Sequence, residues 1–155
     1  MKIAILAHIF YNDLGQELFS YIDRLPYEYD LYFTTQDDSL SDYILSQNPK
    51  AQRVECSNNG MDIGAFFHKL NHIEKKYVYY LKIHTKKEDL WRRSMFESCL
   101  PYKGYDRIFS MIDEYHILGS NKYLFNMSSS HANKDIILKQ IEKHKLPVSE
   151  SDIYT

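Results

Sequence analysis

The 155-residue sequence is short of cysteine, of net charge and of long apolar runs. Its two cysteines, Cys56 and Cys99, form no CxxC pair, which excludes a disulfide framework or a structural zinc site and predicts a reducing compartment, the cytoplasm. The net charge of −2 excludes a general polyanion-binding composition, so no nucleic-acid partner is expected. No stretch approaches the roughly 18 apolar residues that span a bilayer, which predicts a soluble chain whose only membrane contact is peripheral, at the inner face of a bacterial membrane.

Familiar enzyme motifs are absent as well. The sequence contains no G-x-x-x-x-G-K-[ST], no G-x-G-x-x-G, no G-x-S-x-G and no H-E-x-x-H. These absences remove the sequence support for most common enzyme classes. What the chain has in excess is tyrosine, with 14 residues, which suits either the walls of a ligand site or, as we expect, an aromatic core and a surface for homodimer formation.

Strand-like and helix-like patterns alternate along the chain. Strands are predicted at Lys2–Ile9, Tyr29–Thr34, Arg53–Cys56, from Tyr77 onward and at Ile117–Gly119, and helices at Asn12–Arg24, Ser39–Ser46, Asp62–Glu74, Leu90–Leu100, Tyr105–Tyr115 and Asn133–Lys145. Parallel neighbours need a crossover, which a helix usually supplies. The pattern therefore predicts an α/β fold with a mostly parallel, Rossmann-like sheet flanked by helices, in a single domain over residues 1–155.

Polar segments follow four of the predicted strands. They are HIFYND, TTQDDS, SNNGMDIG and KIHTKK. Ligands of open α/β sheets bind outside the carboxyl ends of the strands, where segments of this kind converge. We therefore expect His8, Asp37, Asn59 and His84 to approach one edge of the sheet.

The segment SNNGMDIG has the composition of a phosphate-binding turn. Asn58, Asn59 and Gly60 can adopt the positive φ of a tight turn, and Asp62 is a candidate cap for a helix whose first N–H groups could hold phosphate. The alternative is an ordinary capped helix after a loop, and the segment alone favours it at least equally.

In TTQDDS, the carboxylates of Asp37 and Asp38 are candidate acceptors for a ribose hydroxyl or a base N–H. Asp38 or Ser39 is equally suited to be the N-cap of the next helix. Taken alone, the segment favours the cap.

A group of cations follows the aromatic run YVYYL. Strand alternation places Lys82 and His84 on the face opposite Leu81 and Ile83. A lysine this deep in a strand needs an anion, and we favour a ligand phosphate over a carboxylate of the protein.

More positive charge follows in the same segment. Lys86 and Lys87 come directly after the strand, and Arg92 and Arg93 lie near a helix start, where the dipole disfavours cations, so a bound anion would explain them. The alternative is a solvated helix face.

With these segments in place, the sequence resembles the rhamnan synthesis protein F family of bacterial polysaccharide assembly. The resemblance rests on KIAILAHIFYNDLGQELFSYI, YDLYFTT, NNGMDIGAFF and YLKIHTKK followed by WRR, whose order and spacing cover nearly the whole chain. In the third segment Asn59 and Met61 stand where the family pattern N-R-G-R-D-I-G carries basic residues.

The resemblance implies a glycosyltransferase of the GT-A type, with a nucleotide sugar, deoxythymidine diphosphate rhamnose, as donor and a glycan as acceptor. Such enzymes hold a divalent metal with Asp-x-Asp, but Lys82-Ile83-His84 stands at this place. We therefore expect two cations to neutralise the diphosphate without a metal, with Mn²⁺ or Mg²⁺ as the alternative.

The family's acceptor half would follow this chain, and no carboxylate here is a clear candidate for the catalytic base. The resemblance therefore implies a donor-binding half. The alternative function is a non-catalytic module that binds a nucleotide or an anionic glycan, as a remnant of such an enzyme.

Overall fold

The computed structural model describes residues 3–74, 76–115, 117–120, 122, 138–139, 141–143 and 145. The chain divides into two compact units, Met1–Ser120 and Asn121–Thr155. In the second unit residues 138–139 and 141–143 are helical, and most of the helix predicted over Asn133–Lys145 lies outside the described residues. The single domain over residues 1–155 stays a prediction.

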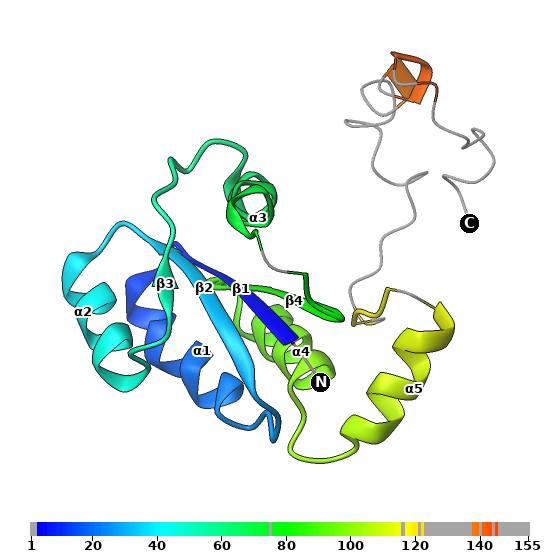
Figure 1. The fold of residues 1–155 in the computed structure, drawn as a ribbon, viewed down its shortest axis with the longest axis horizontal. Helices are drawn as coiled ribbons and strands as arrows, with labels where there is room; N and C mark the ends of the chain where they lie inside the picture. The colour runs from blue at the N-terminus through cyan, green and yellow to red at the C-terminus, as the bar shows by residue number, and fades with distance from the viewer. Residues whose placement is uncertain are drawn as a thin grey trace. The chain divides into compact units, whose positions relative to one another are not determined.

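Four parallel strands form the sheet of the first unit. They are β1 (Ile3–Ile9), β2 (Tyr29–Thr35), β3 (Gln52–Arg53) and β4 (Tyr79–His84). They lie in the order β3-β2-β1-β4, so β1 is central and β4 is an edge strand (Figure 1). Every residue of β1 is buried, as its nearly continuous apolar run predicts for a strand covered on both faces.

Helices connect and flank the strands. They are the 3-10 helix η1 (Asn12–Leu14) and the α-helices α1 (Gly15–Ile22), α2 (Asp38–Gln47), α3 (Met61–His72), α4 (Asp89–Cys99) and α5 (Tyr105–Tyr115). The predicted α/β, parallel and Rossmann-like architecture is confirmed. Within the described part of the chain, no helix has the length and apolar character that a membrane span requires.

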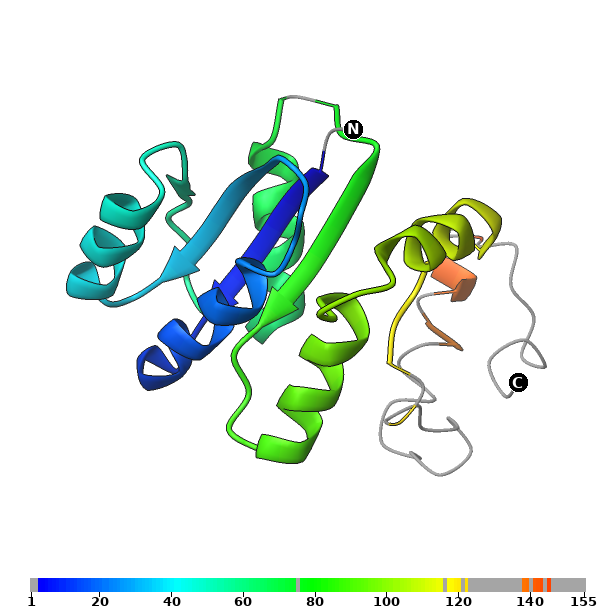
Figure 2. The same ribbon diagram turned by 90° about the horizontal axis from the view of Figure 1, so that it is seen from below.

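The two faces of the sheet carry different cores. Ile3, Ile5, Ala7 and Ile9 of β1 point to a large apolar cluster that includes side chains of α1, α2 and α4. The alternate residues Ala4 and Leu6 belong to a smaller cluster, and among the helices of the described ranges α3 is the one that packs against it. Both views place α3 on the side of the sheet opposite α1 and α4 (Figures 1 and 2). The less covered α3 face therefore has room for polar side chains.

Two predicted strands differ from the structure. The strand predicted at Arg53–Cys56 is shorter and begins earlier, at Gln52–Arg53. Its last contact with β2 is the hydrogen bond from Val54 N to Phe33 O. The chain then leaves the sheet, and the Gln36 side chain donates to the Cys56 carbonyl oxygen. The strand predicted at Ile117–Gly119 is absent. Ile117 is 85% exposed, so this segment lacks the buried face that stabilises a strand.

Candidate functional site

The carboxyl ends of the strands bring four predicted residues to one edge of the sheet. His8 and His84 are register neighbours near the ends of β1 and β4. Asp37 follows β2, and Asn59 lies between β3 and α3. Because the strands are all parallel, the shared edge predicted for these residues is confirmed, whereas their binding of a ligand stays a prediction.

The turn before α3 is tight. Positive φ occurs at Gly60 (77°) and at Met61 (53°), so its prediction at Asn58 and Asn59 is wrong. A Cβ at Gly64 would lie 2.1 Å from the Asn59 carbonyl oxygen, which only glycine avoids.

The predicted cap of α3 is also wrong. The N-cap is Gly60, and no side chain caps the helix. Asp62 lies instead in the first turn, where its carboxylate faces the sheet and pairs with Lys82.

Three polar side chains form a row across the α3 face of the sheet. Thr34, His8 and His84 are register neighbours on β2, β1 and β4. His8 Nδ1 lies 2.7 Å from Thr34 Oγ1. From α3, Lys69 Nζ donates to Thr34 Oγ1 at 3.4 Å, and Asp62 Oδ2 lies 3.8 Å from His84 Nδ1. The row and these two helix residues, together with Lys82, are called the α3-side cluster from here on.

Lys69 is the central cation of the α3-side cluster. Its side chain has no solvent exposure, and among the described residues no carboxylate lies within ion-pair distance of its ammonium group. Burial lowers the pKa of Lys69 to about 8; the charge of Lys82 acts in the same direction, whereas Cys56 and Asp62 oppose it. The group is still mostly protonated at neutral pH, so the protein holds a buried positive charge without a matching contact.

Sequence reasoning missed Lys69 because the apolar pattern of this helix predicts one buried face made of Ile63, Phe66, Phe67, Leu70 and Ile73. Phe66, Leu70 and Ile73 do pack against the smaller core cluster, but Ile63 and Phe67 are 53% and 56% exposed. The fully buried residues of the helix are Ala65 and Lys69, four residues apart, and Asp62 lies three residues before Ala65 on the same face. Two charges at i and i+7 on a sheet-facing stripe were the available signal.

Lys82 has its anion within the protein. Its Nζ lies 2.5 Å from Asp62 Oδ2, so the alternative that we considered less favourable, an internal salt bridge, is the one observed. Burial raises the pKa of Asp62, but the hydrogen bond from Lys82, the charge that His84 carries when it is protonated at acidic pH and the charge of Lys82 lower it more. Asp62 is therefore ionised.

His84 and His8 are both neutral at neutral pH. Burial, followed by the charge of Lys82, lowers the pKa of His84 to about 4. Burial, followed by the charge of Lys69, also lowers the pKa of His8. The second cation expected at the site is thus supplied by Lys69 and not by His84.

The carboxylates of TTQDDS are already engaged. Asp37 is the N-cap of α2, one residue earlier than predicted, and accepts from Leu40 N at 2.9 Å. Asp38 Oδ1 lies 2.6 Å from Arg53 Nη1 in an exposed ion pair. A side-chain cap is thus present in this segment, but at Asp37 and not at Asp38 or Ser39, and neither aspartate belongs to the α3-side cluster.

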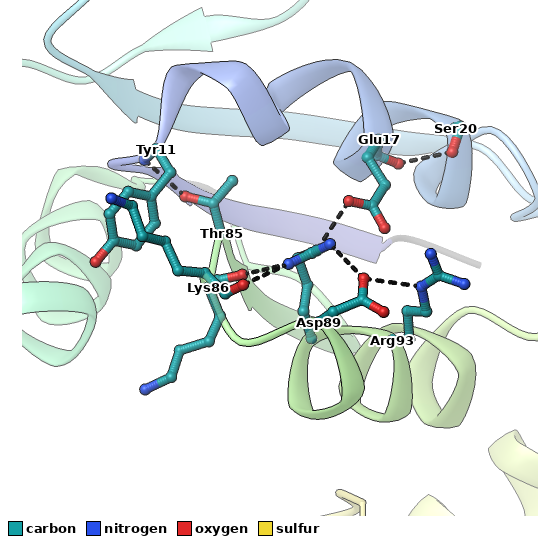
Figure 3. Close-up of polar contacts among 9 residues, drawn as sticks. Tyr11, Glu17, Ser20, Thr85, Lys86, Asp89 and Arg93 are labelled. Atoms are coloured by element: carbon teal, nitrogen blue, oxygen red, sulfur yellow. Dashed lines mark hydrogen bonds and ion pairs between the residues drawn. The ribbon is translucent and has the colours of Figure 1, made fainter.

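Arg92 is buried within a second group of charges. Its Nε donates to Glu17 Oε2 at 2.8 Å, and its Nη2 donates to Asp89 Oδ1 at 2.7 Å. Its Nη1 donates to the carbonyl oxygens of Lys86 (2.7 Å) and Lys87 (3.1 Å), as Figure 3 shows. This set is called the Arg92 cluster, and it joins α1, α4 and the loop after β4.

The Arg92 cluster contradicts the prediction that Arg92 and Arg93 await a ligand anion. Arg92 is 6% exposed and uses all three guanidinium nitrogens on groups of the protein. Arg93 Nε lies 3.0 Å from Asp89 Oδ1 and is solvated. The helix dipole disfavours a cation near the start of α4, and the carboxylates of Glu17 and Asp89 compensate for this at Arg92. Glu17 is 75 residues away from Arg92 in the sequence.

The loop after β4 is held at both ends. The Thr85 hydroxyl oxygen accepts from Tyr11 N at 3.0 Å (Figure 3). It also accepts from Phe10 N at 3.1 Å. The ammonium groups of the two lysines lie over aromatic rings, Lys86 4.1 Å from the Trp91 centroid and Lys87 5.1 Å from that of Tyr11. The charge of Lys86 also lowers the pKa of His84, which places it at the margin of the α3-side cluster.

The arrangement of the α3-side cluster suits an anion. It contains two lysines, one ionised carboxylate and two neutral imidazoles beside a helix start whose backbone N–H groups favour negative charge. In the described ranges no three His, Cys, Asp or Glu side chains are grouped so as to hold a metal ion. Independence from metal stays a prediction.

Comparison with known proteins gives one match. No curated protein and no solved structure shows significant similarity to the chain. The model of one family, described as rhamnan synthesis protein F, matches residues 1–142, which include every strand and the whole α3-side cluster. The chain therefore belongs to the rhamnan synthesis protein F family.

Proposed function

We propose that this chain is a glycosyltransferase domain that binds the diphosphate of a nucleotide sugar at the α3-side cluster. Membership of the rhamnan synthesis protein F family implies a role in the synthesis of this polysaccharide. A rhamnosyl donor such as deoxythymidine diphosphate rhamnose would suit that role, with a growing glycan as acceptor.

The observation that carries the proposal is the buried charge of Lys69. Burying an ammonium group without a carboxylate partner is costly, and a protein retains such a group where it serves function. Lys69 lies at the carboxyl edge of a parallel sheet, the usual ligand position of such folds. A diphosphate bound near it would add negative charge beyond that of Asp62, which is paired with Lys82.

Two further residues are suited to the leaving diphosphate. Lys82 could exchange part of its contact with Asp62 for a phosphate oxygen, and His84 has a buried Nδ1 without a hydrogen-bond partner. Positive charge that is fixed in place before the reaction stabilises the departing diphosphate without reorganisation. In this scheme the lysines perform the task that a divalent metal performs in other glycosyltransferases.

A specific observation keeps a second function open, a non-catalytic module for nucleotides or anionic glycans. Asp62 is the one carboxylate of the α3-side cluster, and it is held by Lys82. A general base must be free to reach the acceptor hydroxyl, which Asp62 is not.

The test is calorimetric titration of the purified chain with thymidine diphosphate, with thymidine as the uncharged control and with Mn²⁺ present or absent. The proposal predicts binding of the diphosphate alone, without metal. Incubation with deoxythymidine diphosphate rhamnose and glycan acceptors then separates transfer from binding. Equal heats from thymidine and thymidine diphosphate would contradict an anion site.

A further inference from the structure

The hydrogen bonds below α3 form a directed chain that ends on His8. Lys69 Nζ lies 3.4 Å from Thr34 Oγ1, and Thr34 Oγ1 lies 2.7 Å from His8 Nδ1. Lys69 has no exposure and Thr34 only 2%, so water does not supply alternative partners. The direction of each hydrogen bond is therefore fixed by what the three groups can donate.

An ammonium group only donates, so Thr34 Oγ1 accepts from Lys69. The threonine hydroxyl then has its own hydrogen left. Among the described residues its other hydrogen-bond partner is His8 Nδ1, at a distance typical of a strong O–H donor. If Nδ1 also carried a proton, the buried hydroxyl hydrogen would have no acceptor, which is unfavourable for a group without access to water.

We propose that Lys69 and Thr34 hold His8 as the neutral tautomer with its proton on Nε2, which makes His8 a hydrogen-bond donor to a ligand oxygen and not a proton acceptor. The two are positioning residues, and the consequence for binding rests on the proposed function. Nε2 is the nitrogen that Thr34 leaves for another acceptor, and Asn58 raises the pKa of the imidazole, as an acceptor beside Nε2–H would.

The electrostatic surroundings favour this assignment. The charges that act on His8 come from Lys69 and Asp62 of α3 and from Lys82 of β4, with His84 beside it in the sheet. The two lysines oppose a third positive charge on the imidazole, whereas Asp62 favours it. Burial, with the two lysines, outweighs Asn58 and Asp62, so the pKa of His8 is lowered and the imidazole is kept neutral.

The assignment also specifies which ligand groups fit. His8 Nε2–H and Lys82 are hydrogen-bond donors, and the charge of the buried Lys69 lies behind them, so the site favours oxygens that carry no proton. Phosphate oxygens meet this requirement, and a sugar hydroxyl that must donate does not. His8 is accordingly excluded as the base that activates an acceptor hydroxyl, because its unprotonated nitrogen faces Thr34.

The experiment is long-range ¹H–¹⁵N correlation NMR of the ligand-free chain labelled at histidine, with His8 assigned by its loss in His8→Gln. We expect an unprotonated Nδ1 and a protonated Nε2 throughout neutral pH. Thr34→Val should allow a mixture of tautomers and Thr34→Ser should restore the single one. Lys69→Met should raise the His8 pKa. A protonated Nδ1, or a tautomer that Thr34→Val leaves unchanged, would overturn the assignment.

Binding of thymidine diphosphate gives an independent measurement. The side-chain amide of glutamine can replace Nε2–H, whereas that of asparagine lies nearer Nδ1. His8→Asn should therefore weaken binding about tenfold more than His8→Gln, the loss of one hydrogen bond to a charged group. Equal weakening would contradict donation from Nε2. No binding by any variant, with the predicted tautomer seen by NMR, would refute the proposed function and leave the tautomer assignment standing.

Discussion

The Arg92 cluster and the α3-side cluster both contain buried positive charge, but the protein neutralises only one of them completely. Arg92 has two carboxylates and two carbonyl oxygens around its guanidinium group. Lys69 has a threonine hydroxyl at 3.4 Å. A group of cations thus indicates a ligand site only where the fold does not place carboxylates beside them. Whether it does so is decided by the tertiary structure.

This difference between the two clusters predicts that removing their buried cations changes stability in opposite directions. The largest change is expected for the substitution of Arg92. Arg92→Met leaves Glu17 and Asp89 without their buried partner and should lower the free energy of unfolding by about 3 kcal/mol or more. Urea denaturation measures it. Arg93→Met, which removes a solvated arginine from the same helix, is the matched control and should change stability far less. Equal losses in both variants would show that the Arg92 cluster is not a structural centre.

Lys69→Met should act in the other direction and raise the free energy of unfolding by about 2 kcal/mol at neutral pH, because an uncompensated buried charge is replaced by an apolar chain of similar length. Lys87→Met, at an exposed position, is the control. A destabilised Lys69→Met would mean that the charge has a partner.

The same variant predicts a pH dependence. Folding lowers the pKa of Lys69 from 10.5 to about 8, so between these values the unfolded chain binds more protons. The wild type should gain stability as the pH rises through this window, since its charged lysine becomes neutral in the folded state first. The excess stability of Lys69→Met over the wild type should therefore be fully present below pH 8 and decrease above it, as denaturation at several pH values would show.

Removal of single lysines should distinguish the clusters by ligand affinity. Lys82→Ala should weaken binding of thymidine diphosphate by about 1–3 kcal/mol, the range for a charge-assisted contact. Lys86→Ala should have a smaller effect, because its ammonium group lies over Trp91 at the margin of the site. Calorimetry measures both, and an unchanged affinity of Lys82→Ala would assign Lys82 to its salt bridge alone.

The smallest expected effect is at Asp62, the acid that competes with a ligand for Lys82. Asp62→Asn keeps the shape of the side chain and removes its charge, and should strengthen thymidine diphosphate binding by about threefold to tenfold. Weaker binding in this variant would show that Asp62 serves the ligand directly.

The sequence alone was sufficient for the sheet and for the edge at which its polar segments meet. The apolar run of β1 and the segments after each strand are local patterns, and parallel strands bring their carboxyl ends together without further information. His8 and His84 therefore lie where they were expected.

The partners of the charges could not be predicted in the same way. Glu17 and Arg92 are 75 residues apart, and nothing in either segment indicates their contact. Lys69 was overlooked because a lysine in an amphipathic helix is normally solvated. The carboxylate that pairs with each cation depends on how α3 and α4 pack, and local sequence patterns do not contain that information.

The most direct test of the central claim is the affinity of Lys69→Met for thymidine diphosphate without metal. Because this variant is expected to be more stable than the wild type, unfolding cannot cause a loss of binding. If the α3-side cluster is an anion site, binding should be at least about tenfold weaker in Lys69→Met and unchanged in Arg93→Met. An affinity equal to that of the wild type in Lys69→Met would contradict the claim.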